Sequence, residues 1–201
     1  GNGGGFVVVP ALVFVFSILA DPTSDLIFVA IGTSLATIVI SSARSVIAHR
    51  AKGAVDFDVV KSWAPWLLLG VGVGLYLASF ARPNQLYSVF AGGVLVYSIY
   101  FLFPKALSNM TFSETMPTGL TRASIASVLG GFSALLGIGG GTPTVITMVA
   151  CSRPIYQAVA TASGVGFIIG LGGAIGFLIL GLGKSDLPVG SIGYVNIPSL
   201  V

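Results

Sequence analysis

Two glycine-rich segments interrupt otherwise apolar stretches and could do chemistry through their backbone alone. Gly1-Asn2-Gly3-Gly4-Gly5 recurs later in the chain as Gly137-Ile138-Gly139-Gly140-Gly141. A glycine costs about 1 kcal/mol relative to alanine inside a helix, so three in succession predict a helix break. A helix that restarts after such a break presents unpaired N–H groups and a partial positive charge. It can therefore hold an anion without any lysine or arginine.

Hydroxyl side chains near these glycines could donate to the same anion. In membrane helices such hydroxyls also bond to their own helix or to a neighbouring one, and small residues serve close helix packing, so a packing role stays open for both groups. The candidate substrate-binding residues are Gly3, Gly4, Gly5, Phe6, Thr33, Ser34, Gly139, Gly140, Gly141, Thr142, Thr161 and Ser163.

The composition excludes an ordinary water-soluble domain. Of the 201 residues, 55% are hydrophobic and only 7% are charged, with a mean hydropathy of +1.01. Soluble domains carry about 25% charged residues, so lipid must solvate most of this chain. The net charge of +3 is small and is better explained by loop topology than by nucleic-acid binding.

Apolar stretches without Asp, Glu, Lys, Arg or His predict the membrane segments. They are Phe6–Ala20, Leu26–Ala43, Ser62–Ala81, Leu86–Phe103, Ala123–Ser152 and Ile155–Gly183, with a seventh beginning near Ile192. Most of them reach or approach the roughly 20 residues that a spanning helix needs. The sequence therefore predicts an all-α, polytopic bundle of transmembrane helices.

The basic residues predict an orientation. We count each glycine-rich segment as one net crossing and alternate the loops across the bilayer. Seven of the nine basic residues then share one side: Arg44, Arg50, Lys52, Lys61, Lys105, Arg122 and Lys184. The other side holds Arg82 and Arg153. By the positive-inside rule, loop 44–61 is cytoplasmic and the turn at 82–85 lies on the opposite side.

A second pair of matched segments indicates an internal duplication. Ala30-Ile31-Gly32-Thr33-Ser34 follows the first glycine segment, as Ala158-Val159-Ala160-Thr161-Ala162 follows the second. We expect a tandem repeat of two four-segment halves in the same orientation, with the two glycine breaks meeting near the midplane. The expected units are a first repeat over 1–104, a cytoplasmic connecting loop over 105–121 and a second repeat over 122–201. Both ends are interpreted as truncations, because residue 1 is not Met and the chain stops in an apolar run.

The doubled glycine motif, Gly32-Thr33-Ser34, the basic loop 49–56 and the segment 133–141 resemble the TauE/SafE sulfite exporter family. The resemblance covers nearly the whole chain. It implies a multi-pass protein of a bacterial inner (plasma) membrane that exports or takes up sulfite, sulfonates or related sulfur anions. The second half departs from the first in carrying Ile146 where the first has Pro10, so the halves can contribute unequally.

The function expected is secondary transport of a small sulfur oxyanion or sulfonate, in the direction of export. The alternatives are an anion channel and a non-transporting membrane protein with an assembly or regulatory role. No enzyme is expected, because no carboxylate pair or His-rich metal cluster lies in a span. We therefore expect no catalytic residue, metal or cofactor. The expected partners are the anion and the lipid bilayer, without nucleic acid, and a homo-oligomer stays open.

Overall fold

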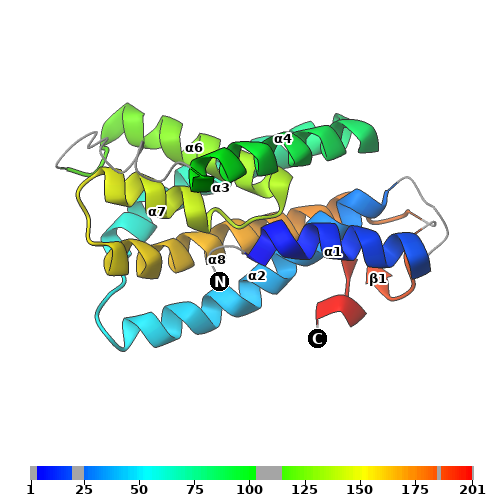
Figure 1. Ribbon diagram of the computed structural model, residues 1–201, viewed down its shortest axis with the longest axis horizontal. Coiled ribbons are helices and arrows are strands. Elements are labelled where there is room, and N and C mark those ends of the chain that lie inside the picture. The colour runs from blue at the N-terminus through cyan, green and yellow to red at the C-terminus, as the bar shows by residue number, and fades with distance from the viewer. Residues whose placement is uncertain (1–3, 20–24, 103–114, 185–186, 201) are drawn as a thin grey trace.

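The computed structural model describes residues 4–19, 25–102, 115–184 and 187–200 of the chain, and Figure 1 shows their arrangement. Nearly all of the described elements are helices, as the sequence predicts. They are α1 (Gly4–Leu19), α2 (Leu26–Arg50), α3 (Phe57–Phe80), α4 (Pro83–Leu102), α6 (Gly119–Leu136), α7 (Gly141–Ala150) and α8 (Ile155–Leu180). By length and composition, four of these could cross a membrane: α2, α3, α6 and α8.

Local sequence explains where the helices begin and end. The Asp56 side chain accepts the N–H of Val59 at 3.1 Å and so caps the start of α3. Proline occupies the first position of α4, where a missing N–H costs nothing. One expectation is corrected at α2, which continues through Arg50 rather than ending at Ala43. Residues 44–50 of the expected basic loop are thus in α2, and residues 57–61 are already in α3.

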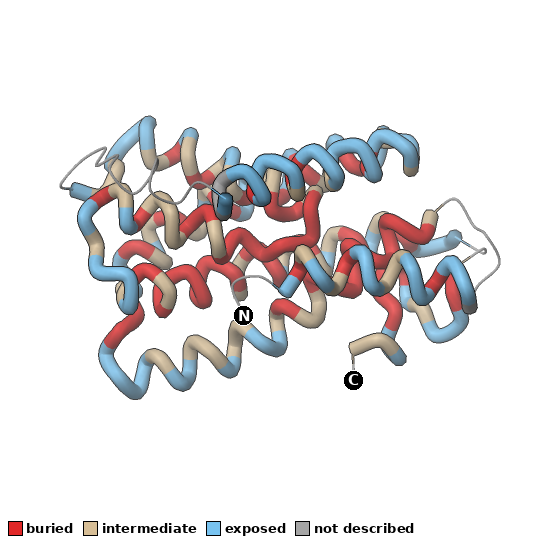
Figure 2. The backbone as a smooth tube through the Cα atoms, in the orientation of Figure 1, coloured by how far each residue is buried: buried red, intermediate tan, exposed pale blue. Residues whose placement is uncertain are grey.

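The long central helices α2 and α8 are antiparallel. At one end of the pair, the Asp25 carboxylate lies 3.8 Å from Lys184 Nζ. Toward the other end, the hydroxyls of Ser45 and Ser163 are hydrogen-bonded at 2.8 Å. Residues early in α2 therefore lie beside residues late in α8. In Figure 2 most of the buried residues line this central region, and the outer helices expose apolar surface.

Helices α6 and α7 form a hairpin that returns to the end where it started. A pocket of about 630 Å³ is lined both by the first turns of α6 and by the last turn of α7, including Thr121, Ile125, Thr147 and Ala150. The glycine break thus reverses the chain, and counting this segment as one net crossing was wrong. In Figure 1, α1 and α7 both start near the middle of the bundle and run toward opposite ends.

This reversal corrects the expected relation between the halves and the positions of two basic residues. Because α2 and α8 carry the matched segments 30–34 and 158–162 and are antiparallel, the same-orientation arrangement is wrong. Arg153 lies at the end of the bundle that contains His49, and Lys184 lies at the opposite end, beside Asp25. Six of the eight described basic residues still share the His49 end, where α2 and α7 finish and α3, α6 and α8 begin: Arg44, Arg50, Lys52, Lys61, Arg122 and Arg153. Lys105 and most of the connecting loop 105–121 lie outside the described residues.

Cysteine labelling distinguishes the two topologies. We expect an impermeant maleimide added from outside to label Asn84→Cys and Lys184→Cys but not Lys52→Cys. The native Cys151 is buried, and burial raises the pKa of its thiol, so it should react slowly. If Lys184→Cys behaves like Lys52→Cys, the segment containing the break crosses the membrane and the hairpin is refuted.

The chain after α8 is not the start of a seventh span within the described residues. Strands β1 (Ser191–Ile192) and β2 (Val195–Asn196) pair antiparallel, and a 3₁₀ turn, η1 (Pro198–Leu200), follows. Gly193 has φ +55° in the connecting turn, a conformation that glycine adopts without strain. The small hairpin packs against both α2 and α8. A Cβ on Gly32 of α2 would overlap the carbonyl of Tyr194, and a Cβ on Gly193 would overlap the carbonyl of Leu178 on α8.

Candidate substrate-binding site

The break between α6 and α7 is built from glycines in the left-handed region. Gly137 ends α6 with φ +68°, and Gly139 and Gly140 have φ +65° and +68°. Residues with a Cβ pay roughly 1–2 kcal/mol to adopt this conformation. The motif is therefore required for the turn, as the sequence predicts, and all five of its residues are buried.

The break lies at the middle of the bundle. A Cβ on Gly139 would contact Ile38 at the centre of α2, and one on Gly140 would overlap Ile169 at the centre of α8. Half-helix α7 starts here with Gly140 as its N-cap. Its first turn contains no acidic residue, and the N-cap Gly140 has no side chain to accept from the N–H groups of that turn. The positive end of the helix dipole therefore points into the bundle centre without a countercharge from its own first turn.

Ser133 adds a hydroxyl without a partner at the same place. Its side chain is fully buried, and its Oγ has no hydrogen-bond partner among the described residues. The Oγ lies 3.2 Å from where a Cβ on Gly140 would be. A buried polar atom left unpaired costs about 1–3 kcal/mol, so the Ser133 hydroxyl is a donor that a ligand at the start of α7 would satisfy. Sequence reasoning missed this residue, although a serine one turn before the glycines was a usable signal.

The two glycine motifs meet, as the sequence predicts. A Cβ on Gly5 would overlap the carbonyl oxygen of Gly137 and lie 2.7 Å from Cα of Ile138. The first turn of α1 therefore rests directly on the break. Phe6 is half-buried and packs edge-on against Tyr97, with ring centroids 4.7 Å apart. Gly4 is exposed with open space around its Cβ position, and Gly3 lies outside the described residues.

The candidate hydroxyls separate into two groups. Ser34 belongs to the break, because its buried Oγ donates to the carbonyl of Gly137 at 2.8 Å. Thr142 lies in the first turn of α7 and is half-buried. Ser163 instead pairs with Ser45 on α2. The structure thus brings Ser34 and Thr142 to the glycine break and places Ser163 farther along α8.

Thr33 and Thr161, which the matched segments make equivalent, hold connections at opposite ends of the bundle. The N–H of Asn196 donates to Thr33 Oγ1 at 2.9 Å, and the N–H of Asp56 donates to Thr161 Oγ1 at 2.9 Å. Asn196 also accepts the N–H of Ser199 at 3.1 Å, as Asp56 accepts that of Val59. Each threonine therefore accepts a backbone N–H from the residue that caps the next helix: Asn196 before η1 and Asp56 before α3.

The electrostatic character of the site comes from dipoles. The buried polar residues of the described part are all neutral: Thr33, Ser34, Ser133, Thr144, Thr161, Ser163 and Asn196. Among the described residues, no group of three His, Cys, Asp or Glu side chains could hold a metal ion. Backbone N–H groups and hydroxyls are suited to bind the oxygen atoms of an anion.

Comparisons with known proteins agree with this picture. The chain is 30% identical over 207 residues to a "probable membrane transporter protein" of Haemophilus influenzae, covering 100% of this chain and 75% of the relative. Proteins with the same description in Methanocaldococcus jannaschii and Bacillus subtilis are 28% and 29% identical over 205 residues each. These alignments cover 98% and 90% of this chain and 72% of each relative. No solved structure matches the chain.

A family model matches the chain over residues 1–201, and its description is sulfite exporter TauE/SafE. The doubled glycine motif from which the resemblance was drawn is the part of the chain that forms the central break. The helical, apolar architecture and the relatives' descriptions as membrane transporters point the same way. The chain belongs to the TauE/SafE family of membrane transporters.

Proposed function

We propose that the protein is a secondary transporter of small sulfur-containing anions, such as sulfite and sulfonates, and that it works in the direction of export. The observation that carries the proposal is the fully buried Ser133 hydroxyl, unpartnered at the start of α7. A negatively charged oxygen there would accept a hydrogen bond from the hydroxyl and face the positive end of the half-helix. The sulfur substrate rests on the name of the family.

The proposed site consists of Gly5, Ser34, Ser133, Gly139–Gly141 and Thr142. The α7 start supplies N–H groups, Ser133 supplies a donor, and Ser34 fixes the turn through Gly137. Thr33, Thr161 and Ser163 contribute by holding the surrounding helices, because their hydroxyls already bond to other segments. Such a site selects for charge and oxygen atoms while carrying no fixed cation.

The proposed mechanism is alternating access between two halves of opposite orientation, over 1–104 and 122–201. Its support is the pairing of Thr33 with Asn196 and of Thr161 with Asp56, since these equivalent bonds lie toward opposite ends of the α2–α8 pair. Opening one end while the other stays closed would expose the central break to each side in turn. The basic end, with loop 44–61, is proposed to face the cytoplasm of a bacterial inner membrane.

Transport in liposomes tests the function. We expect the reconstituted protein to exchange labelled sulfite, taurine or sulfoacetate for the same unlabelled anion inside, with saturable kinetics. Such counterflow distinguishes a carrier from a channel, which would only dissipate the gradient. No flux of any of these anions, with the protein folded, would favour the non-transporting alternative.

Replacing Ser133 with alanine should separate transport from stability. We expect uptake to fall by about 10- to 100-fold, because a hydrogen bond to a charged group contributes roughly 1.5–3 kcal/mol. Without anion, the melting temperature should stay equal or rise, since the orphan hydroxyl is removed. Ser124→Ala on the exposed face of α6 is the matched control, and its uptake should be unchanged. A Ser133→Ala protein that is less stable and transports normally would contradict the site.

A further inference from the structure

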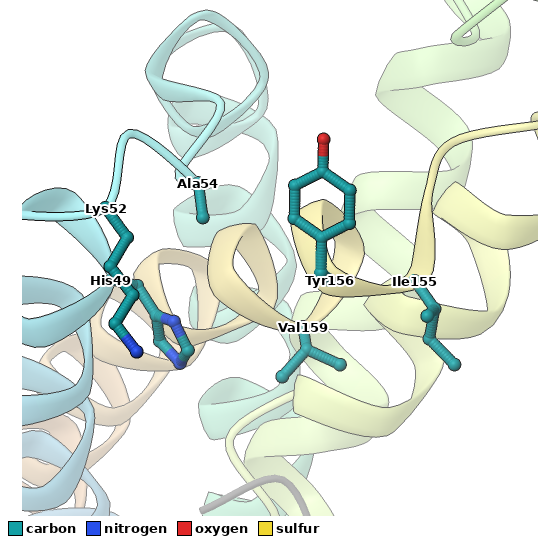
Figure 3. A pocket seen from close by; sticks show the side chains of 6 residues that line it. All are labelled: His49, Lys52, Ala54, Ile155, Tyr156 and Val159. Atoms are coloured by element: carbon teal, nitrogen blue, oxygen red, sulfur yellow. The ribbon is translucent and has the colours of Figure 1, made fainter.

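A second pocket lies at the basic end of the bundle, between the end of α2, the following loop and the start of α8. Its volume is about 370 Å³. Figure 3 shows the side chains that line it, which are His49, Lys52, Ala54, Ile155, Tyr156 and Val159. His49 is half-buried on the last turn of α2.

The lining has the composition of an anion site. His49 and Lys52 lie side by side in Figure 3, and no acidic side chain lines the pocket. The nearest acid along the loop, Asp56, already caps α3. Ala54 and Val159 supply apolar walls that lower the local dielectric and lengthen the reach of the cationic side chains.

A continuous line of small and hydroxyl residues connects this pocket to the glycine break. Below His49 and Val159, one helical turn deeper on each helix, the hydroxyls of Ser45 and Ser163 bond at 2.8 Å. One turn farther, a Cβ on Gly166 would lie 3.1 Å from Ser42 Oγ and 3.2 Å from the carbonyl oxygen of Gly139. Gly139 belongs to the break itself.

We propose that this pocket is the cytoplasmic vestibule in which the oxyanion docks before it reaches the break, and that the Ser45–Ser163 bond closes the route between them. The proposal rests on the proposed function. It assigns His49 and Lys52 to capture of the anion at one face only. A phospholipid phosphate shares the same chemistry, and exposed Ile155 and Tyr156 could face its acyl chains, so the test must distinguish the two sources.

The test is counterflow of labelled sulfite in oriented vesicles, with sulfite added separately to each face. For the double variant His49→Gln/Lys52→Gln we expect the apparent KM at the His49 face to rise about tenfold, with kcat and the opposite face unchanged. The increase should shrink in high salt, because screening removes the attraction in the wild type. Lys61→Gln, an exposed cation at the same end but outside the pocket, is the matched control and should keep the wild-type KM.

A second variant tests the route. Ser45→Leu should lower kcat at least about tenfold by filling the seam, while Ser41→Leu on the exposed face of the same helix should not. A wild-type KM for the double variant at both faces would overturn the vestibule and leave the transport function standing. A KM change seen only in vesicles with anionic lipid would mean that the pocket binds a lipid headgroup, and it would also overturn the vestibule. A wild-type protein that moves no anion would overturn both proposals.

Discussion

Replacing Gly5 with alanine should abolish transport while the protein still folds. The added methyl would overlap the carbonyl oxygen of Gly137. Neither group can rotate away, because the Cβ is fixed by the backbone of α1 and the carbonyl is itself part of the backbone. Half-helix α1 must therefore move off the break, and the two glycine motifs separate. Overpacking of this kind costs about 1–3 kcal/mol, partly offset by the better helix propensity of alanine. We expect uptake of sulfite to fall by at least about 100-fold, because a shift of about 1 Å in a binding geometry can have this effect.

The control for Gly5→Ala is Gly92→Ala on α4. Gly92 is exposed and a Cβ there meets nothing within 4 Å, so its uptake and melting temperature should match the wild type. Both variants should elute as single, symmetrical peaks in detergent. If Gly5→Ala transports at the wild-type rate, contact between the two half-helices is a packing feature and not part of the site.

Replacing Gly70 with leucine should disrupt the fold itself. Helices α3 and α6 are parallel and approach so closely that a Cβ on Gly70 would overlap the carbonyl oxygen of Ser127. The same is true of Gly130 against the carbonyl of Leu67. Small residues allow such close packing in membranes, where dispersion replaces the hydrophobic effect. We expect a loss of at least about 3 kcal/mol and little recoverable folded protein.

Gly72→Leu is the matched control, since Gly72 is on the same helix but is exposed, with open space at its Cβ position. Thermal melts followed by tryptophan fluorescence measure the difference, because both tryptophans of the chain, Trp63 and Trp66, lie on α3. Equal melting temperatures for the Gly70 and Gly72 variants would show that α3 and α6 are not packed as described.

The sequence predicted the elements well because hydropathy and turn residues act locally. Expected spans such as Leu86–Phe103 and Ile155–Gly183 coincide closely with α4 and α8. Hydropathy carries no direction, however, so it could not show that the chain reverses at Gly137–Gly141. That reversal depends on positive φ angles, which the glycines permit without dictating.

The candidate site was predictable to the extent that it is made of backbone. The break and the convergence of the two motifs follow from the doubled glycine segment. Ser34 was expected to donate to the anion, but its hydroxyl donates to the carbonyl of Gly137 instead. The equivalent hydrogen bonds of Thr33 and Thr161 could not be predicted from the sequence, because their partners lie 163 and 105 residues away along the chain. Ser133 was missed for a related reason, since an unpaired hydroxyl is defined by what surrounds it in space.

The central claim is that an anion binds at the glycine break between the half-helix starts. Selenite, the selenium analogue of sulfite, allows it to be located directly by anomalous scattering from crystals of the protein in the presence of this anion. We expect one dominant selenium peak within hydrogen-bond reach of Ser133 Oγ and the N–H groups of Gly139–Gly141. That peak should disappear in the Ser133→Ala protein. A dominant peak elsewhere, with the break empty, would contradict the claim.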